Sequence, residues 1–220
     1  MLNQQARTQS ATAKKTGLSF LLILSALMAV TSLSTDIYLP AMPVMAKDLQ
    51  GDAELTITGF LICFCIAQLI WGPISDRYGR RLPLFIGLGL FIIGSVGCAL
   101  STDIVQIVFW RVFQALGACT GPMLARAMIR DLFSRTRAAQ MLSTLMIIMA
   151  IAPIAGPLIG GQMIKVTSWH AIFRLLAIIG TLMLMSLFWL PETLPAEKRS
   201  HPGPTAEPER RYRYVVEPVP

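Results

Sequence analysis

The ten residues Gly72–Arg81 read GPISDRYGRR and lie between two long apolar stretches of the chain. Glycines at 72 and 79 permit tight turns, and Pro73 favours a helix end or a kink. The ionisable side chains of this stretch are Asp76, Arg77, Arg80 and Arg81. A short, basic connection between two membrane-length segments is expected at a membrane face. The alternative is that this stretch is an ordinary loop on the positively charged side of the membrane, where any arginine-rich turn would serve.

Composition indicates a membrane protein, because the chain is 54% hydrophobic, 14% charged and has a mean hydropathy of +0.60. A spanning helix needs about 20 apolar residues, and strands would instead show a short alternating pattern. Windows of this length with few or no ionisable residues cover 16–35, 55–75, 82–102, 104–125, 138–164 and 166–191. The sequence therefore predicts an all-α membrane protein with six transmembrane helices.

The predicted organisation has a short N-terminal tail over 1–16, a six-helix domain over 17–194 and a tail over 195–220. The last segment is rich in proline and charge, which is typical of disorder. The first window resembles the hydrophobic part of a signal peptide. However, it lacks a small-residue cleavage site and five further windows follow it, so we expect an uncleaved helix.

The distribution of Lys and Arg predicts the orientation. The N-terminal tail and every second connection hold Arg7, Lys14, Lys15, Arg77, Arg80, Arg81, Arg126, Arg130, Arg135 and Arg137, whereas the opposite connections hold only Lys47 and Lys165. The positive-inside rule places the richer side in the cytoplasm. The net charge of +7 then follows from topology and requires no nucleic-acid partner. Trp71, Trp169 and Trp189 are predicted to form aromatic belts at the membrane interfaces.

Two charged residues inside the spans suggest a function. Asp36 lies near the outer end of the first span and Arg111 in the outer half of the fourth. A charge in the bilayer costs at least about 2.5–3.5 kcal/mol, so such residues usually face a polar cavity. The alternatives are an interfacial carboxylate for Asp36 and snorkelling for Arg111. Further along, Gly156 and Gly160 form a small-residue face beside Pro157, which favours close packing or kinking of the fifth helix. These features predict a transporter.

Four motifs resemble those of the major facilitator superfamily. GPISDRYGRR is similar to its 2–3 loop signature at Gly72, Asp76, Arg77, Gly79, Arg80 and Arg81. RVFQALGA resembles its helix 4 signature at Arg111, Gln114 and Gly117, with Ala115 where glycine is expected. GPLIGG resembles its helix 5 antiporter signature at Gly156, Pro157, Gly160 and Gly161. TDIYLPAMP and LPETL are similar to segments of the bicyclomycin-resistance and chloramphenicol-efflux (Bcr/CflA) family.

The resemblance implies the N-terminal half of a multidrug/proton antiporter in the bacterial inner membrane. Asp36 would then be the proton-coupling carboxylate, its charge acting on groups such as Arg111, and Gln114 would line the same polar region. The 2–3 loop would form a cytoplasmic gate, and the segment 156–161 a flexible packing seam. Its partners would be the bilayer, protons and small hydrophobic drug-like substrates, with no cofactor or metal.

The superfamily fold has twelve spans, whereas this sequence predicts six. A truncated or frameshifted product and a true half-transporter that needs a second six-helix half both remain open. The other readings are a small-metabolite transporter of the same superfamily, which the GPLIGG motif disfavours, and a non-transporting membrane fragment. No nucleotide-binding loop, catalytic triad or metal-ligand cluster is visible in the sequence, so an enzyme is not expected.

Overall fold

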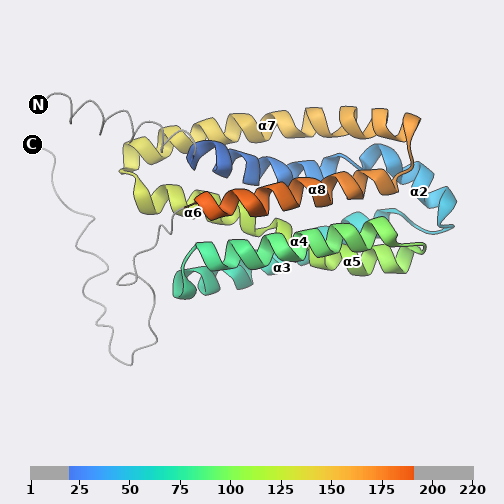
Figure 1. The fold of residues 1–220 in the computed structure, drawn as a ribbon, viewed down its shortest axis with the longest axis horizontal. Helices are drawn as coiled ribbons and strands as arrows, with labels where there is room; N and C mark the ends of the chain where they lie inside the picture. Colours follow the sequence, from blue (N-terminus) through green and yellow to red (C-terminus); the bar gives the residue numbers. More distant parts are fainter. Residues whose placement is uncertain (1–19, 191–220) are drawn as a thin grey trace, which may run out of the picture.

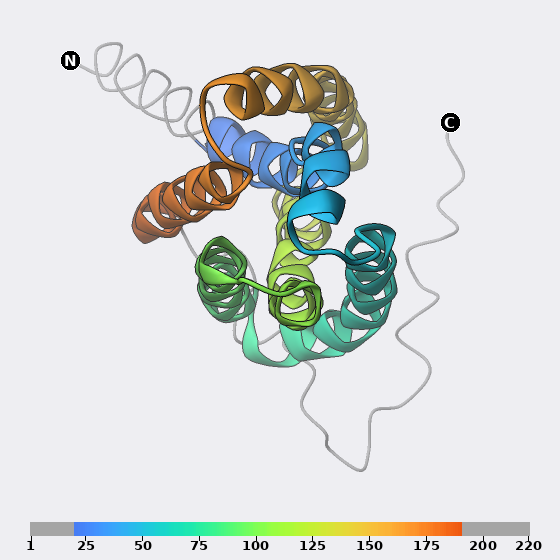
Figure 2. The ribbon, with the colours of Figure 1, turned by 90° about the vertical axis from the view of Figure 1, so that its right-hand side faces the viewer.

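The computed structural model describes residues 20–190 and arranges them as a bundle of helices. Six helical segments in this part of the chain are long and apolar enough to cross a membrane, which confirms the predicted all-α fold. They run side by side along the longest axis in Figure 1, and the end-on view in Figure 2 shows how they pack around one another. The predicted tails 1–16 and 195–220 lie outside the described residues.

The elements follow the predicted windows closely. The first span consists of a helix over 20–36, the 3₁₀ turn η1 (Leu39–Ala41) and α2 (Met42–Asp48). The remaining elements are α3 (Glu54–Tyr78), α4 (Arg81–Leu100), α5 (Ile104–Ala118), α6 (Thr120–Leu132), α7 (Arg135–Val166), α8 (His170–Ser186) and the 3₁₀ turn η2 (Leu187–Trp189). Because hydrocarbon offers no hydrogen bonds, each segment satisfies its backbone internally as a helix.

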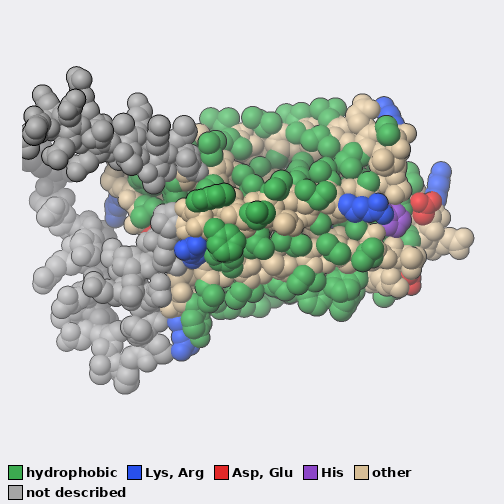
Figure 3. All heavy atoms as spheres, in the orientation of Figure 1, with side chains coloured by type: hydrophobic (Ala, Val, Ile, Leu, Met, Phe, Trp, Pro, Cys, Tyr) green, Lys and Arg blue, Asp and Glu red, His purple; other side chains and the backbone are tan. Residues whose placement is uncertain are grey.

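The two ends of the bundle differ in charge. The connections α3–α4 and α6–α7 meet at one end, which we call the basic end because Arg77, Arg80, Arg81, Arg130 and Arg135 lie there. The other end carries Asp48, Asp52, Glu54 and Asp103 and is called the opposite end. Figure 3 shows hydrophobic side chains along the length of one face, with charged side chains gathered toward its two ends. This is the surface expected of a membrane-spanning bundle.

The fourth span has a local break in its hydrogen bonding, although its backbone stays helical at Cys119. α5 ends at Ala118 and α6 begins at Thr120, so Cys119 interrupts the helix predicted over 104–125. Pro122 has no N–H, and its ring collides with the carbonyl four residues earlier, that of Ala118. The Ala118 carbonyl instead accepts a hydrogen bond of 2.8 Å from the Thr31 hydroxyl on the first helix. The break is therefore stabilised by a neighbouring helix.

Glycines bring the first helix and α7 into close contact. A Cβ atom added at Gly160 would overlap the carbonyl oxygen of Ile37, and one added at Gly156 would lie 2.9 Å from the Cβ atom of Asp36. A Cβ atom at Gly161 would meet nothing within 4 Å. Two of the glycines of the GPLIGG motif thus form the seam, while Gly161 faces away from it. α7 continues as one helix through Pro153 and Pro157.

The stretch that opened the sequence analysis is mostly helical, which corrects its interpretation as a loop. Gly72 and Pro73 lie inside α3, which extends to Tyr78. Gly79 alone among these residues turns the chain, with a φ of 96° in the region that favours glycine. Helix α4 begins two residues later at Arg81. The connection is short because the helix continues beyond the apolar window, where water or headgroups can solvate its charged side chains.

The tryptophan prediction is wrong for two of the three residues. Trp71 is buried and donates a hydrogen bond of 2.9 Å to the Leu116 carbonyl. Trp169 is only 1% exposed and donates to Asp48 at 3.2 Å. Trp189, in contrast, is 80% exposed. The buried pair therefore ties elements together inside the bundle, whereas Trp189 has the exposure expected of a membrane-interface residue.

Candidate functional site

Arg111 is the most unusual side chain in the described bundle. It projects from α5 and is fully buried in the bundle interior. Its Nη1 atom donates to Gln114 Oε1 at 2.6 Å and to the Ser34 carbonyl at 3.3 Å. Among the described residues, no carboxylate lies within ion-pair distance of it. A buried charge without a counter-ion is costly, so other groups must stabilise it.

Aromatic rings take the place of a counter-ion. The guanidinium carbon lies 3.7 Å from the centre of the Tyr38 ring, 5.0 Å from that of Phe60 and 5.3 Å from that of Phe173. The negative face of an aromatic ring attracts a cation, by about 2 kcal/mol or more when both are desolvated. Rings from the first span, α3 and α8 therefore form a cage around the charge on α5.

Gln114 extends this polar region toward α4. Its Nε2 atom donates to the Ser95 hydroxyl at 2.8 Å, and that hydroxyl donates to the Phe91 carbonyl at 2.7 Å. Both side chains are fully buried. The residues Arg111 and Gln114, singled out by the helix 4 motif, are thus brought together in one hydrogen-bonded chain. Ser95 is the third member of this hydrogen-bonded chain. Its role follows only from the packing of α4 against α5.

Asp36 ends the first helix and lies apart from this chain. It is partly exposed, accepts a hydrogen bond of 3.3 Å from the neighbouring Thr35 hydroxyl, and has its Cβ atom against the Gly156 backbone of α7. Asp36 and Arg111 make no ion pair in this structure. They are connected through the backbone, because Ser34 and Tyr38, which both contact Arg111, lie two residues to either side of Asp36.

Several buried polar atoms around Arg111 have no partner among the described residues. These are its Nε and Nη2 atoms and the Tyr38 hydroxyl. Buried polar groups are normally hydrogen-bonded, so these atoms need a partner that the described residues do not supply. The sequence analysis did not single out Tyr38, because its role depends on the contact of its ring with Arg111.

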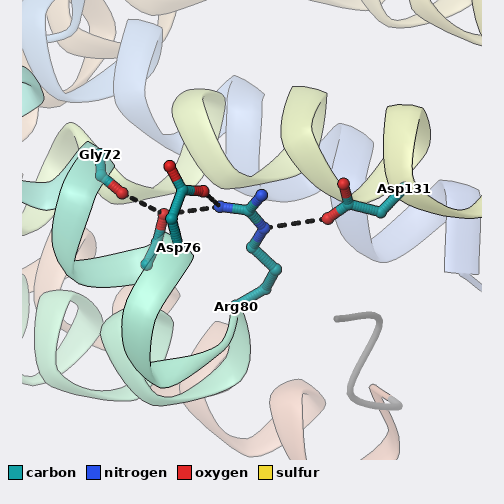
Figure 4. Close-up of polar contacts among 5 residues, drawn as sticks. Gly72, Asp76, Arg80 and Asp131 are labelled. Atoms are coloured by element: carbon teal, nitrogen blue, oxygen red, sulfur yellow. Dashed lines mark hydrogen bonds and ion pairs between the residues drawn. The ribbon is translucent and has the colours of Figure 1, made fainter. Parts of the chain in front are cut away.

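A second polar cluster occupies the basic end (Figure 4). Arg80 donates through Nη1 to Asp76 at 2.6 Å and through Nε to Asp131 at 2.9 Å. Its Nη1 atom also donates to the Ser75 hydroxyl at 2.7 Å, which in turn donates to the Gly72 carbonyl at 2.8 Å. The cluster therefore links the end of α3 to the end of α6. Asp76 and Arg80, both residues of the 2–3 loop motif, form an ion pair, whereas Asp131 was not singled out from the sequence.

Burial alone would lower the pKa of the Arg80 side chain. The hydrogen bonds that Arg80 donates to Asp131 and Asp76, together with the negative charges of these carboxylates, outweigh burial and raise that pKa above its ordinary value. Arg80 thus stays charged at any physiological pH. The other arginines of the motif lie elsewhere. Arg77 is exposed beside the Tyr78 ring, and Arg81 donates to the Phe188 carbonyl at 3.3 Å.

Asp76→Asn should affect stability little. The Asp76 side chain is 55% exposed, and exposed ion pairs contribute about 0.2–1 kcal/mol. Asp131 is less exposed, at 22%, so Asp131→Asn should lower the unfolding temperature more. Thermal unfolding of the purified chain in detergent measures both, with the exposed Glu54→Gln at the opposite end as the control. A loss of folded protein with Asp76→Asn would show that this residue has a structural role.

Comparison with known proteins identifies the family. The model of the Major Facilitator Superfamily matches residues 24–218. The chain is 41% identical over 192 residues to the uncharacterized MFS-type transporter YdgK of Bacillus subtilis, covering 84% of this chain and 47% of that protein. It is 30% identical over 188 residues to multidrug resistance protein D of Escherichia coli, covering 84% and 48%. It is 35% identical over 179 residues to a chloramphenicol resistance protein of Pseudomonas aeruginosa, covering 78% and 42%.

Solved structures agree on the fold. The human organic anion transporter MFSD10 matches with a TM-score of 0.68 at 18% identity, over 82% of this chain and 49% of that one. The proton:xylose symporter XylE matches with a TM-score of 0.72 at 18% identity, over 80% and 45%. The chain spans about half the length of the curated relatives it matches. With six membrane-length segments and a family match over most of its length, this chain belongs to the major facilitator superfamily.

Proposed function

We propose that this chain is the N-terminal six-helix half of a proton-coupled multidrug antiporter of the bacterial inner membrane. Relatives at 30–35% identity carry the names multidrug resistance protein D and chloramphenicol resistance protein, which supports drug efflux as the activity. The basic end would face the cytoplasm, because the positive-inside rule places Lys and Arg there. The opposite end, with Asp48, Asp52 and Glu54, would then face outward.

The observation that carries the proposal is the buried Arg111 with its incomplete set of partners. A cation inside a membrane bundle normally marks an ion, proton or substrate pathway. Arg111 is held by rings and by neutral hydrogen-bond acceptors, and two of its nitrogen atoms have no partner among the described residues. It is therefore available to a carboxylate or a polar substrate that approaches in another state of the transport cycle.

Asp36 would supply the proton-dependent charge. The last turn of the first helix holds the Ser34 carbonyl that accepts from Arg111, and the next turn holds Tyr38, whose ring lies against Arg111. Protonation removes the negative charge of Asp36 and so changes the electrostatic balance along this backbone segment. A shift of the segment would alter the Arg111 cage and bias the bundle between two states.

The antiport cycle would require a second six-helix half. Transporters of this kind work by the rocking of two bundles around a site near the membrane midplane. α3 and α7 are mostly exposed in the described bundle, with 17% of each membrane-length window buried. Those faces are available to lipid and to a partner half. The cluster of Asp76, Arg80 and Asp131 at the basic end would then act as the cytoplasmic gate, with the Gly156–Gly160 seam permitting helix movement.

A transport assay tests the function. The chain would be joined to the second half of E. coli multidrug resistance protein D and expressed in everted membrane vesicles. Chloramphenicol uptake should rise with an acid-inside proton gradient and fall to background when an ionophore dissipates it. Asp36→Asn should remove the gradient dependence, whereas Glu54→Gln, an exposed carboxylate at the same end, should not. Gradient-driven uptake by Asp36→Asn equal to wild type would make Asp36 an ordinary interfacial carboxylate.

The proposed orientation predicts which residues can be labelled from outside the cell. In a variant with all four cysteines replaced by serine, single cysteines would be introduced at Asp52, Thr167 and Arg135. A membrane-impermeant maleimide should react with the first two in intact cells. It should react with the cysteine at position 135 only after permeabilisation, because that position lies at the basic end. Labelling of position 135 in intact cells would reverse the orientation.

A further inference from the structure

A groove of about 450 Å³ opens between α3 and α6 at the basic end. α3 lines one side and α6 the other, and Arg80 closes the end near the α3–α4 connection. Its charged lining residues are Asp76, Arg80, Arg126, Arg130 and Asp131. Three arginines and two aspartates among them leave one net positive charge, concentrated on α6.

The charges within the groove are unequally matched. Arg80 is held between Asp76 and Asp131, so these three side chains together carry one net negative charge, against the two positive charges of Arg126 and Arg130. Arg126 and Arg130 make no hydrogen bond or ion pair with any described residue, and the Nε atom of Arg126 is buried without an acceptor. They are four residues apart and so lie on the same face of α6. Two like charges placed this way repel each other.

The partial negative charge at the end of α6 can stabilise only one of the two arginines. Arg130 lies in the last turn of α6, where the partial negative charge of the helix end favours a cation. That effect fades within one turn, so it does not reach Arg126. The buried Nε atom of Arg126 therefore lacks an explanation within the described bundle. An anion bound between the two side chains would supply its acceptor and cancel the repulsion.

We propose that Arg126 and Arg130 bind a phosphate group in this groove. Guanidinium groups match phosphate oxygens with paired, charge-assisted hydrogen bonds. The exposed Gln68 amide at the other end of the groove adds a neutral donor. The site is independent of what the protein transports, and so goes beyond the proposed function.

The distances of the two arginines from the end of α6 are comparable with the thickness of a membrane headgroup layer. Arg126 and Arg130 precede Leu132, the last residue of α6, by six and two residues, which at 1.5 Å per residue is about 9 and 3 Å. The headgroup region of one leaflet is about 5–8 Å thick. Toward the deeper part, Met123, Ala127 and Gly72 offer a small apolar surface. The phosphate group can come from an anionic phospholipid or from a free phosphate ester.

Binding measurements on the purified chain of residues 1–220 distinguish these sources. The chain would be titrated in detergent micelles with dioleoyl phosphatidylglycerol and, separately, with inorganic phosphate, and binding followed by native mass spectrometry and thermal unfolding. The test variant is Arg126→Gln with Arg130→Gln. The control is Arg135→Gln with Arg137→Gln, which removes the same charge from exposed positions at the same end but outside the groove.

The glutamine pair in the groove should weaken binding of one probe at least tenfold, while the control pair stays within twofold of wild type. Arginine-dependent binding of phosphatidylglycerol alone assigns the site to lipid, and binding of inorganic phosphate assigns it to a soluble phosphate. If the glutamine pair does not fold, Arg126→Lys with Arg130→Lys decides, because it keeps the charge and loses the planar fork. Binding by the lysine pair equal to wild type, or binding by the glutamine pair equal to the control, would overturn the proposal.

Discussion

Arg111→Met should abolish proton-coupled efflux without unfolding the bundle. Methionine fills much of the same volume and packs against Tyr38, Phe60 and Phe173, but it carries no charge for a proton-dependent carboxylate to act upon. Chloramphenicol uptake by everted vesicles of the joined protein should therefore fall to the level of vesicles without it. Arg174→Met, which removes an exposed arginine of α8, is the matched control and should retain uptake.

The unfolding temperature of Arg111→Met shows whether the charge of Arg111 is needed for transport alone or also for the stability of the bundle. Burial of an arginine costs at least about 2.5–3.5 kcal/mol on insertion scales, and here no described carboxylate offsets that cost. Replacing a buried charge with an apolar side chain is often neutral or stabilising. The unfolding temperature of the variant in detergent should equal or exceed that of wild type. A lower temperature accompanied by loss of helical signal would mean that the Arg111–Gln114 chain holds the bundle together.

Much of the fold could be predicted because the bilayer restricts it so strongly. Windows without charge must become helices, and their number and limits follow from counting ionisable residues. Predictions failed where they depended on contacts between helices. The break at Cys119 was missed, although Pro122 in the same span was a signal for it, and the Thr31 hydroxyl that stabilises it comes from a helix far away in sequence.

In the candidate site, too, some residues could be predicted from the sequence, whereas others are explained only by contacts between helices. Arg111 stood out because charged residues are rare in a span, whereas Gln114 was named through the resemblance to the helix 4 motif, and the two side chains do meet. Tyr38 could not be distinguished from an interfacial tyrosine, since its role depends on the position of its ring relative to Arg111. Asp131 was overlooked because 51 residues separate it from Arg80, and only the packing of α6 beside α3 brings the two together.

Gly160→Ala should disrupt the packing of the first helix against α7. The added methyl group would overlap the carbonyl oxygen of Ile37, which is backbone and cannot rotate away. The two helices must therefore separate, which also moves Asp36 from its contact with Gly156. Overpacking of this kind typically costs about 1–3 kcal/mol. We expect a lower unfolding temperature and a smaller yield of folded protein from detergent-solubilised membranes.

Gly161→Ala provides the control, because it adds the same methyl group to the next residue of α7, where a Cβ atom meets nothing within 4 Å. Alanine also has a higher helix propensity than glycine by up to about 1 kcal/mol. Gly161→Ala should therefore leave the bundle unchanged or stabilise it slightly. The propensity gain is common to both positions, so the difference between the two variants isolates the contact with Ile37. Equal unfolding temperatures would show that the first helix and α7 can separate freely, and that Gly160 sets neither their distance nor the position of Asp36.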